Sequence, residues 1–393
     1  MSAHPRFVQI HTLHNYPAAL LNRDDAGLAK RLPYGNAVRT RISSQCQKRH
    51  WRTAEGTHAL SGIGVPMAIR SRELLGEIRK RLLEQEIAEP LAQAAIEALR
   101  NAGLLDKAGK NQKGKEALST GQAVLLGKAE MDYLVAKCTE LAQQHPDEKA
   151  LRTEIAETLK KEKNNIQAMK LGSGLESALF GRMVTSDVLA RRDASIYVAH
   201  AFTVHEAQVE NDYFTVVDDL LREEGEQGSA GIFDTELTSG LYYGYVVVDV
   251  PQLVANLEGI DIKDCFSVDK QYRELAGQVI HNLLHLMATV SPGAKKGSTA
   301  PFEWAKFMLV EAGDQQPRSL AGAYHDALSL EQTHIRQQAV ARLSQELQMT
   351  DAAYGAVGQR RFLSLDDVRV PSAERLALPA MAQWIQARVV EGA

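Results

Sequence analysis

The sequence has few cysteines, no signal segment and no long apolar run, the features that mark disulfide-rich, secreted and membrane proteins. Its 393 residues hold only three cysteines, Cys46, Cys138 and Cys265, which lie far apart and form no Cys-x-x-Cys pair. We therefore expect neither a disulfide framework nor a cysteine zinc site. The segment MSAHPRFVQI lacks an apolar signal core, and no run of about twenty apolar residues follows it. These absences predict a cytoplasmic protein without a membrane partner.

A general excess of positive charge is also missing. The chain has 45 Lys and Arg residues against 49 Asp and Glu residues, a formal net charge of −4. This balance argues against a protein that is basic all over, as many nucleic-acid binders are. It leaves room for a local basic track, because binding depends on where Lys and Arg cluster. With 45% hydrophobic residues, the chain can form one large domain with insertions or two domains.

Basic residues do cluster at the end of the segment 22–52. The pattern predicts a short strand at Val38–Ile42, a polar turn, and a helix. Ser44 and Gln47 have the Ser-x-x-Gln spacing of a capping box, so we expect the helix to start there. The basic side chains of this segment are Arg39, Arg41, Lys48, Arg49 and Arg52.

The predicted helix places Gln45, Lys48, Arg49 and Arg52 near one face, since three- and four-residue steps align on a helix. A helix N-terminus attracts anions, and the Lys and Arg side chains on the same helix add positive charge. Together they predict a phosphate-binding site. A solvated basic helix face is the alternative. In the preceding loop, Arg23 could contact phosphate or pair with a neighbouring aspartate.

Residues 60–175 change character and follow helical patterns, with leucines and isoleucines at three- and four-residue steps. Pro90 is expected to separate two helices. A further helix is expected near Gly127–His145. Lysine runs in this region are usually only a solvated face. The lysines are Lys107, Lys110, Lys113, Lys160, Lys161 and Lys163.

Two later segments also carry candidate ligand contacts. Arg182 and Met183 follow Gly181, where a backbone can approach a ligand closely, although Met183 by itself would suit a core position. The segment from Ala199 to Ser239 has poor core-forming composition and suits a protruding hairpin. Its candidate contacts are Tyr213, Phe214 and Thr215, which could also pack as an ordinary strand.

The second half of the sequence predicts a strand at Leu241–Val250, a helix at Asp269–Thr289 and a strand at Phe307–Gly313. Two further helices are predicted, one over 320–347 and one near the C-terminus. His281 and His285 share a face of the first helix. The motif is HNLLH, with Asn where a metalloprotease needs Glu, so we expect packing or surface histidines and no metal. The loop after this helix holds Lys295 and Lys296 without P-loop spacing.

Several blocks, in order, resemble the CasC family, the backbone subunit of type I-E CRISPR Cascade complexes. They are NRDD (22–25), YGN (34–36), RTRISSQCQKRHWR (39–52), GRMVTSD (181–187), AHAFTVHEAQVENDYFTVVDDL (199–220), TSGLYYGYVVVD (238–249) and VSPGAKKGSTA (290–300). Residues 60–170 and about the last sixty are similar to the family only in being helical.

The resemblance implies an α+β fold with an RRM-like, or ferredoxin-like, palm. Helical fingers would be inserted at 60–175 and a thumb hairpin at 201–238, leaving the palm to residues 1–59, 176–200 and 239–393 with C-terminal helices. It implies that the thumb residues Tyr213, Phe214 and Thr215 enter the guide–target duplex. It also implies that the fingers face target DNA, which makes the six lysines named above candidates for non-specific DNA contacts. The implied RNA contacts are Arg23, Arg39, Arg41, Ser43, Gln45, Lys48, Arg49, Arg52, Arg182, Met183, Lys295 and Lys296.

The resemblance further implies a filament of identical copies along crRNA, with target DNA bound through the guide. The other partners would be the large subunit, the small subunit, the guide-processing endonuclease and the 5′-end cap subunit. It implies no catalytic residue, metal or other cofactor. Two alternatives stay open, a guide-directed ribonuclease that uses Asp24 or Asp25 and a general single-strand binder.

Overall fold

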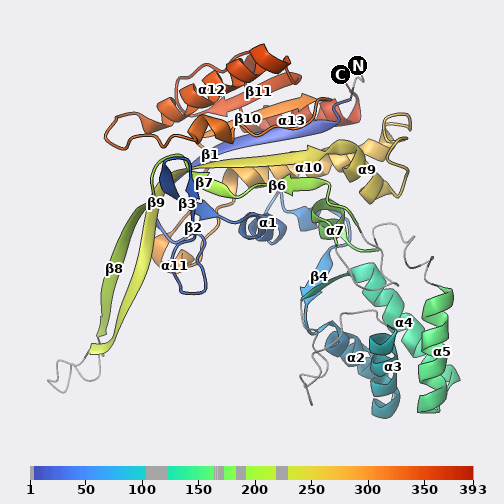
Figure 1. The fold of residues 1–393 in the computed structure, drawn as a ribbon. Coiled ribbons are helices and arrows are strands. Elements are labelled where there is room, and N and C mark those ends of the chain that lie inside the picture. The colour runs from blue at the N-terminus through green and yellow to red at the C-terminus, as the bar shows by residue number, and fades with distance from the viewer. Residues whose placement is uncertain are drawn as a thin grey trace. The chain divides into compact units, whose positions relative to one another are not determined.

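The computed structural model describes residues 4–102, 123–162, 164, 166, 172–182, 192–217 and 229–392. The predicted contacts Met183, Lys107, Lys110, Lys113 and Lys163 lie outside these residues. The chain divides into two compact units (Figure 1). The first unit consists of residues 1–60, 197–248 and 277–393, and the second of residues 61–196 and 249–276.

A ten-stranded sheet forms the centre of the first unit. Its main path is β12-β11-β10-β1-β9-β7-β3-β2, while β6 and β8 pair with β9. The strands are β1 (Phe7–Ala19), β2 (Arg31–Tyr34), β3 (Ala37–Ile42), β6 (Ile196–Val198), β7 (Ala201–Thr203), β8 (Gln208–Val217), β9 (Ser229–Asp249), β10 (Phe307–Gly313), β11 (Gln359–Ser364) and β12 (Ala373–Arg375).

The middle of this sheet is covered on both faces. Strand β10 lies between β1 and β11, antiparallel to both. It has the bounds predicted from the sequence, and its residues from Phe307 to Ala312 are buried. Its first four residues, Phe307 to Val310, are apolar without alternation, which is typical of a strand without a solvent-facing side. Phe307 and Leu309 pack in one core with residues of α12.

The helices of the first unit are α1 (Ser44–Arg52), most of α10 (Gln271–Thr289), α11 (Lys296–Thr299), α12 (Ile335–Tyr354) and α13 (Leu378–Val390). The prediction of one helix over 320–347 is wrong in its first half. A single 3₁₀ turn at Ala321–Tyr324 is followed by a loop, and α12 begins only after His334, whose φ is +59°. Tertiary contacts hold this loop, since Leu328 is buried and its N–H donates to Val204 O (2.9 Å).

The second unit is mainly helical. Its helices are α2 (Leu74–Glu84), α3 (Glu89–Asn101), α4 (Lys128–Gln144), α5 (Glu148–Lys161), α7 (Leu175–Phe180) and α9 (Val250–Glu258). Pro90 stands in the first turn of α3 and separates it from α2, as predicted. The prediction of purely helical patterns over residues 60–175 is wrong at two places, because β4 (Ala68–Ser71) pairs with β5 (Val124–Gly127). Four-residue strands are too short to show a clear period in the sequence.

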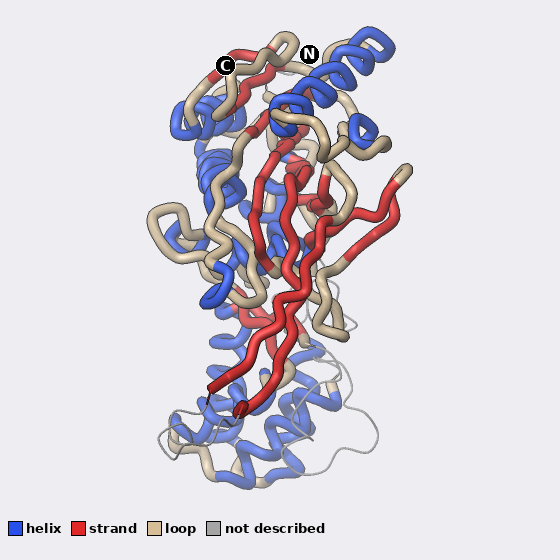
Figure 2. The backbone as a smooth tube through the Cα atoms, turned by 90° about the vertical axis from the view of Figure 1, so that its left-hand side faces the viewer, coloured by secondary structure: helices blue, strands red, loops and turns tan. Residues whose placement is uncertain are grey.

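A hairpin extends from the sheet of the first unit (Figures 1 and 2). Strand β8 pairs with the first part of β9, from Gln208↔Ser239 to Val217↔Ser229. The second part of β9 runs through the sheet, where Tyr242 and Tyr243 are buried. One continuous strand, β9, therefore joins the hairpin to the core.

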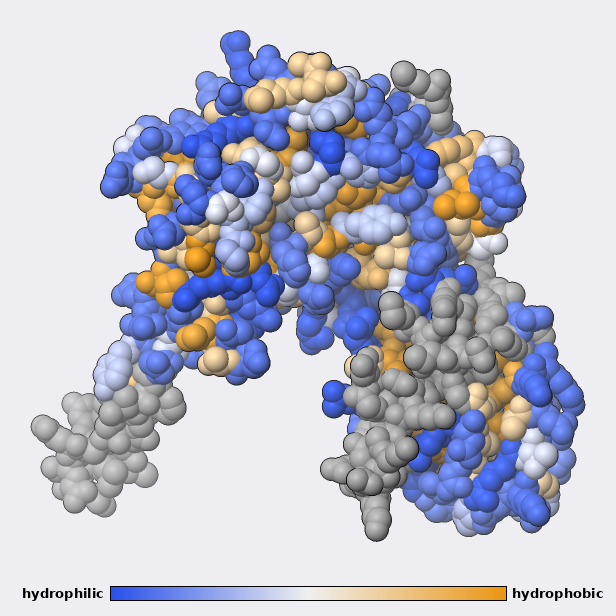
Figure 3. All heavy atoms as spheres, viewed as in Figure 1, coloured by the Kyte–Doolittle hydropathy of each residue, from blue (hydrophilic) through white to orange (hydrophobic). Residues whose placement is uncertain are grey.

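The surface is mostly hydrophilic in the view of Figure 3, where apolar atoms form separate patches. Among the helices that the structure describes, none is both long enough and apolar enough to cross a membrane.

Candidate nucleic-acid interface

Helix α1 starts where the sequence predicted, but with a different cap. Ser43 is the N-cap, and its hydroxyl accepts a hydrogen bond from the N–H of Cys46 (3.2 Å). The predicted capping box of Ser44 and Gln47 is wrong, because the Gln47 side chain donates to Ala199 O (2.9 Å). Ser43 is buried, so we assign it to capping and correct its prediction as an RNA contact.

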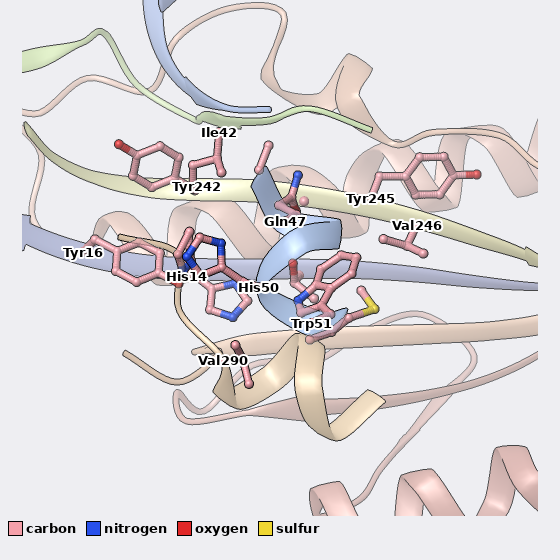
Figure 4. Close-up of a pocket in the computed structure, with 15 residues that line it drawn as sticks. His14, Tyr16, Ile42, Gln47, His50, Trp51, Tyr242, Tyr245, Val246 and Val290 are labelled. Atoms are coloured by element: carbon pink, nitrogen blue, oxygen red, sulfur yellow. The ribbon is translucent and has the colours of Figure 1, made fainter. Parts of the chain in front are cut away.

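The two faces of α1 have different surroundings. Gln47, His50 and Trp51 line a cavity of about 30 Å³ beside His14 and Tyr16 of β1 (Figure 4). A cavity of this size holds little more than a water molecule, so this face anchors the helix. The opposite face carries the predicted cluster. Gln45 and Arg49 are exposed and Lys48 and Arg52 are half-buried.

Three segments meet beside α1 through hydrogen bonds that their backbone N–H groups donate. Asn22 accepts from Lys30 N–H through its carbonyl (2.9 Å) and from Ser43 N–H through Oδ1 (2.8 Å). The preceding Leu20 carbonyl accepts from Ala294 N–H (2.8 Å). The loop after β1, the start of α1 and the loop before α11 are therefore held together.

The same segments concentrate positive charge. Burial raises the pKa of Cys46 to about 11, although Lys30 and Lys296 lower it. Burial lowers the pKa of His50, and Lys296 and Arg49 lower it further. Burial likewise lowers the pKa of His200, as do Arg41 and Lys30. These effects put four cations in one electrostatic neighbourhood, which we call the basic patch: Lys30, Arg41, Arg49 and Lys296.

Sequence reasoning missed Lys30, although a signal for it was present. A turn at Gly35 and Asn36 aligns Arg31 with Thr40 in the hairpin of β2 and β3. The next residue outward is Lys30, whose carbonyl accepts from Arg41 N–H (2.8 Å). Residues directly opposite in an antiparallel pair point to the same face, so counting back from the turn would have paired Lys30 with Arg41.

The structure contradicts the prediction that Arg39 contacts RNA. Its side chain is fully buried and donates to the carbonyls of Thr203 (3.0 Å), Tyr324 (3.0 Å) and His325 (3.3 Å). Period-two alternation puts Arg39 and Arg41 on the same face of β3. The turn that ends at Tyr324 covers Arg39, whereas Arg41 stays half-buried.

The prediction for Arg182 is also wrong. Arg182 is buried in the second unit and forms a bidentate ion pair with Glu130 of α4, with N–O distances of 2.5 and 2.8 Å. A buried guanidinium engaged in this way is a structural group. Its neighbour Met183 lies outside the described residues.

Arg23 lies exposed in the loop after β1. The alternative considered from the sequence, an ion pair with Asp24 or Asp25, is not formed. The Asp24 carboxylate instead accepts from the N–H of Leu28 (2.9 Å) and closes the loop. Among the described residues, Arg23 has no ion-pair partner within 4.0 Å. Its position next to Asn22 places it beside the junction of the three segments.

The hairpin presents its aromatic residues on opposite faces. Tyr213 is 63% exposed and Phe214 is 40% exposed. Consecutive strand residues point to opposite sides, and the Phe214 ring centroid lies 6.0 Å from the Nζ of Lys295. Thr215 pairs through its backbone with Ile232. The Phe214 face of the hairpin is therefore the one next to the loop before α11.

The described lysines of the helical unit lie at the end of α5. Lys160 and Lys161 are exposed, and Lys161 pairs with Glu157 (3.4 Å). An exposed pair of this kind is a solvated surface feature. For metal ligands, the described part of the chain holds one group, His58, His281 and His285.

Comparison with known proteins places the chain in a family. The profile of the CT1975-like protein family, a Cas family, matches residues 8–387. The chain belongs to the CT1975-like family. This assignment confirms the resemblance to CRISPR-associated proteins, while the narrower CasC assignment stays a prediction. No curated protein sequence matches this CT1975-like chain.

Solved structures are similar to this CT1975-like chain over almost its whole length. One is a chain of a "CRISPR RNA-guided surveillance complex, pre-nicking", with 26% identity and a TM-score of 0.76, over 98% of this chain and 100% of that one. Another is a chain of a "CRISPR RNA-guided surveillance complex", with 23% identity and a TM-score of 0.66, over 97% and 99%. The second likeness concerns the fold alone.

Proposed function

We propose that this chain is the backbone subunit of a type I-E CRISPR surveillance complex and polymerises along crRNA. The observation that carries this proposal is the basic patch, which three separate chain segments build beside the outward face of α1. Membership of the CT1975-like family and the 26% identical chain from a CRISPR RNA-guided surveillance complex support it.

In this proposal the basic patch and α1 hold the guide by its phosphates. Arg49 and Lys296 are exposed and Arg41 is half-buried, so these side chains can bind phosphate oxygens without reading bases. Gln45 lies in the first turn of α1, where free N–H groups favour an anion. Sequence specificity then belongs to pairing between guide and target.

The sheet of the first unit would be the RRM-like palm, the helices of residues 60–175 the fingers, and the β8–β9 hairpin the thumb. The exposed Tyr213 side chain is free to stack on a base, which typically contributes about 1–3 kcal/mol per base. The thumb of one copy would displace a base at regular intervals and leave the intervening bases for pairing. Head-to-tail contacts that do not close would produce the filament.

The partners in this proposal are crRNA, target DNA through the guide, further copies of the chain and the other Cascade subunits, in the cytoplasm. We propose no catalytic role. The Asp24 carboxylate, a candidate for a ribonuclease, is engaged by the N–H of Leu28. Magnesium-dependent cleavage of bound target RNA that is lost on Asp25→Ala would contradict this part of the proposal.

The test is to express the chain with a CRISPR array and the neighbouring genes, purify the complex and sequence its RNA. We expect one discrete guide RNA, protected along its spacer by several copies of the chain. Arg49→Ala with Lys296→Ala should lower RNA retention equally for all guide sequences and reduce the salt slope by about 0.7 per lost contact. Lys263→Ala is the control, because Lys263 is 78% exposed in a separate ion pair with Asp261.

Two outcomes would overturn the proposal. Heterogeneous RNA with and without the array would indicate a general single-strand binder. Unchanged RNA retention by the double variant at raised salt would show that the basic patch does not hold the guide.

A further inference from the structure

We propose that His58, His281 and His285 form a binding site for a divalent transition metal ion of the Zn²⁺ class. The site would join the segment that follows α1 to helix α10. This inference is independent of guide binding, since it rests on three imidazoles and not on the basic patch.

The fold brings these histidines together from two distant parts of the first unit. His281 and His285 are one helical turn apart on α10, so their side chains lie on the same face. His58 reaches them from the loop between α1 and the 3₁₀ turn at Leu60–Ile63. One potential ligand atom from each residue lies within 4.8 Å of the other two.

The rings themselves are in contact. The His58 and His285 centroids are 3.6 Å apart with an interplanar angle of 10°. The His281 centroid lies 5.0 Å from that of His285 and 5.6 Å from that of His58. Three mutually close imidazoles repel one another when protonated, so the arrangement favours neutral rings, the form that binds metals.

The surroundings of the three histidines also favour neutral imidazole rings. Burial, together with the charges of His58 and His281, lowers the pKa of His285 to about 4. The Nδ1 of His281 lies 3.2 Å from the Oδ1 of Asn282. If Nδ1–H donates to this amide oxygen, the Nε2 lone pair is left for an ion, which is the usual arrangement around a ligating histidine.

Metal binding requires a small closing movement. Two nitrogens at about 2.0–2.1 Å from a tetrahedral zinc ion are roughly 3.3 Å apart, closer than the 4.8 Å limit within which the three ligand atoms lie. The stacked rings of His58 and His285 also have to tilt so that the ion lies in both ring planes. His58 is half-buried in a loop, so rotation of its side chain can supply this change.

The ligand set indicates which metal ions the site can bind. Imidazole nitrogens suit Zn²⁺, Cu²⁺, Ni²⁺ and Fe²⁺ rather than Mg²⁺ or Ca²⁺. Three protein ligands leave the fourth position of a tetrahedral ion to water. The helix motif HNLLH has Asn282 where a metalloprotease has its glutamate base. A bound ion would therefore hold the loop of residues 53–60, which follows Arg52 at the end of α1, against α10.

The test uses the full chain without an affinity tag, stripped with a chelator and then titrated with Zn²⁺. Calorimetry and metal analysis should show one tightly bound ion per chain, and Zn²⁺ should raise Tm. Co²⁺ should give the intense visible absorption of a four-coordinate site. His58→Gln and His285→Gln should each lose the bound equivalent and the Tm shift.

The matched control is His145→Gln, since His145 lies outside the cluster and should leave zinc binding unchanged. His285 is buried, so His58→Gln decides the question if His285→Gln fails to fold. The proposal is overturned if the unmodified chain binds no stoichiometric zinc, if His58→Gln binds it as well as the unmodified chain, or if His145→Gln abolishes it.

Discussion

The Nζ of Lys295 lies 2.5 Å from the Oγ1 of Thr235 and donates a hydrogen bond to it. Thr235 is buried on the part of β9 that pairs with β8. This contact ties the loop before α11 to the hairpin. It also separates the roles of two adjacent lysines, because Lys295 is half-buried while Lys296 is exposed.

Replacing Lys295 by methionine should loosen the hairpin. The substitution removes the hydrogen bond to Thr235 and the charge near the Phe214 ring, which together should cost about 1 kcal/mol at this half-buried site. Hydrogen exchange of the β8–β9 amides should become faster. Lys296→Met is the control, and it should lower RNA retention without changing exchange. Equal exchange in both variants would contradict the assigned roles.

The two hairpin aromatics should respond differently to truncation. Tyr213→Ala should leave guide loading unchanged and weaken target-duplex formation by about 1–3 kcal/mol, because an exposed aromatic stacks on bases. Phe214→Ala should have the smaller effect if its ring serves mainly to pack beside Lys295. Filter binding of target DNA to purified complexes measures both, and equal loss of guide loading would indicate a folding defect instead.

Arg182→Ala should destabilise the second unit rather than impair RNA binding directly. The variant leaves the Glu130 carboxylate buried without its partner, which typically costs about 3–5 kcal/mol. Urea unfolding measures the change. The double variant Arg182→Met with Glu130→Gln should recover much of the stability, since no charge is left buried. Normal stability together with lost RNA binding would restore Arg182 as an RNA contact.

The unfolding free energy should depend on pH through His14. Burial lowers the pKa of His14 from 6.5 to about 4, so the folded state resists the proton that the unfolded chain accepts. Stability from this group is fully present above pH 6.5 and is lost as pH falls toward 4, by up to about 3 kcal/mol. His14→Gln should flatten the profile in this window, as measured by chemical denaturation, while His145→Gln should not. An unchanged slope in His14→Gln would contradict the assignment.

Several arginines are buried inside the protein, where they form ion pairs and hydrogen bonds with other buried groups. Glu311 of β10 accepts hydrogen bonds from Arg318 (2.6 and 2.8 Å), Arg360 (2.7 Å) and His11 (3.2 Å). Burial raises the pKa of Glu311, but the hydrogen bonds and charges of Arg318 and His11 lower it below its usual value. Like Arg39 and Arg182, these arginines serve the core, and charge alone could not distinguish them from surface arginines.

Short stretches of sequence were enough to predict the helices and strands whose formation depends mainly on residues close together in the chain. The amino-acid sequence by itself determined that a helix starts at about Ser44, that β10 is a strand and that Pro90 separates two helices. It also determined the outward face of α1, because Gln45, Lys48, Arg49 and Arg52 follow helical spacing. These features are decided by propensity and periodicity over a few residues.

Only the tertiary structure decided which cations are available and which histidines meet. Arg39 and Arg41 look equivalent two residues apart, yet the turn at Tyr324 buries one of them. Nothing in the spacing of HNLLH indicates that His58, more than two hundred residues earlier, joins it. Burial and long-range contact depend on how distant segments pack, and that information is not contained in any short stretch of chain.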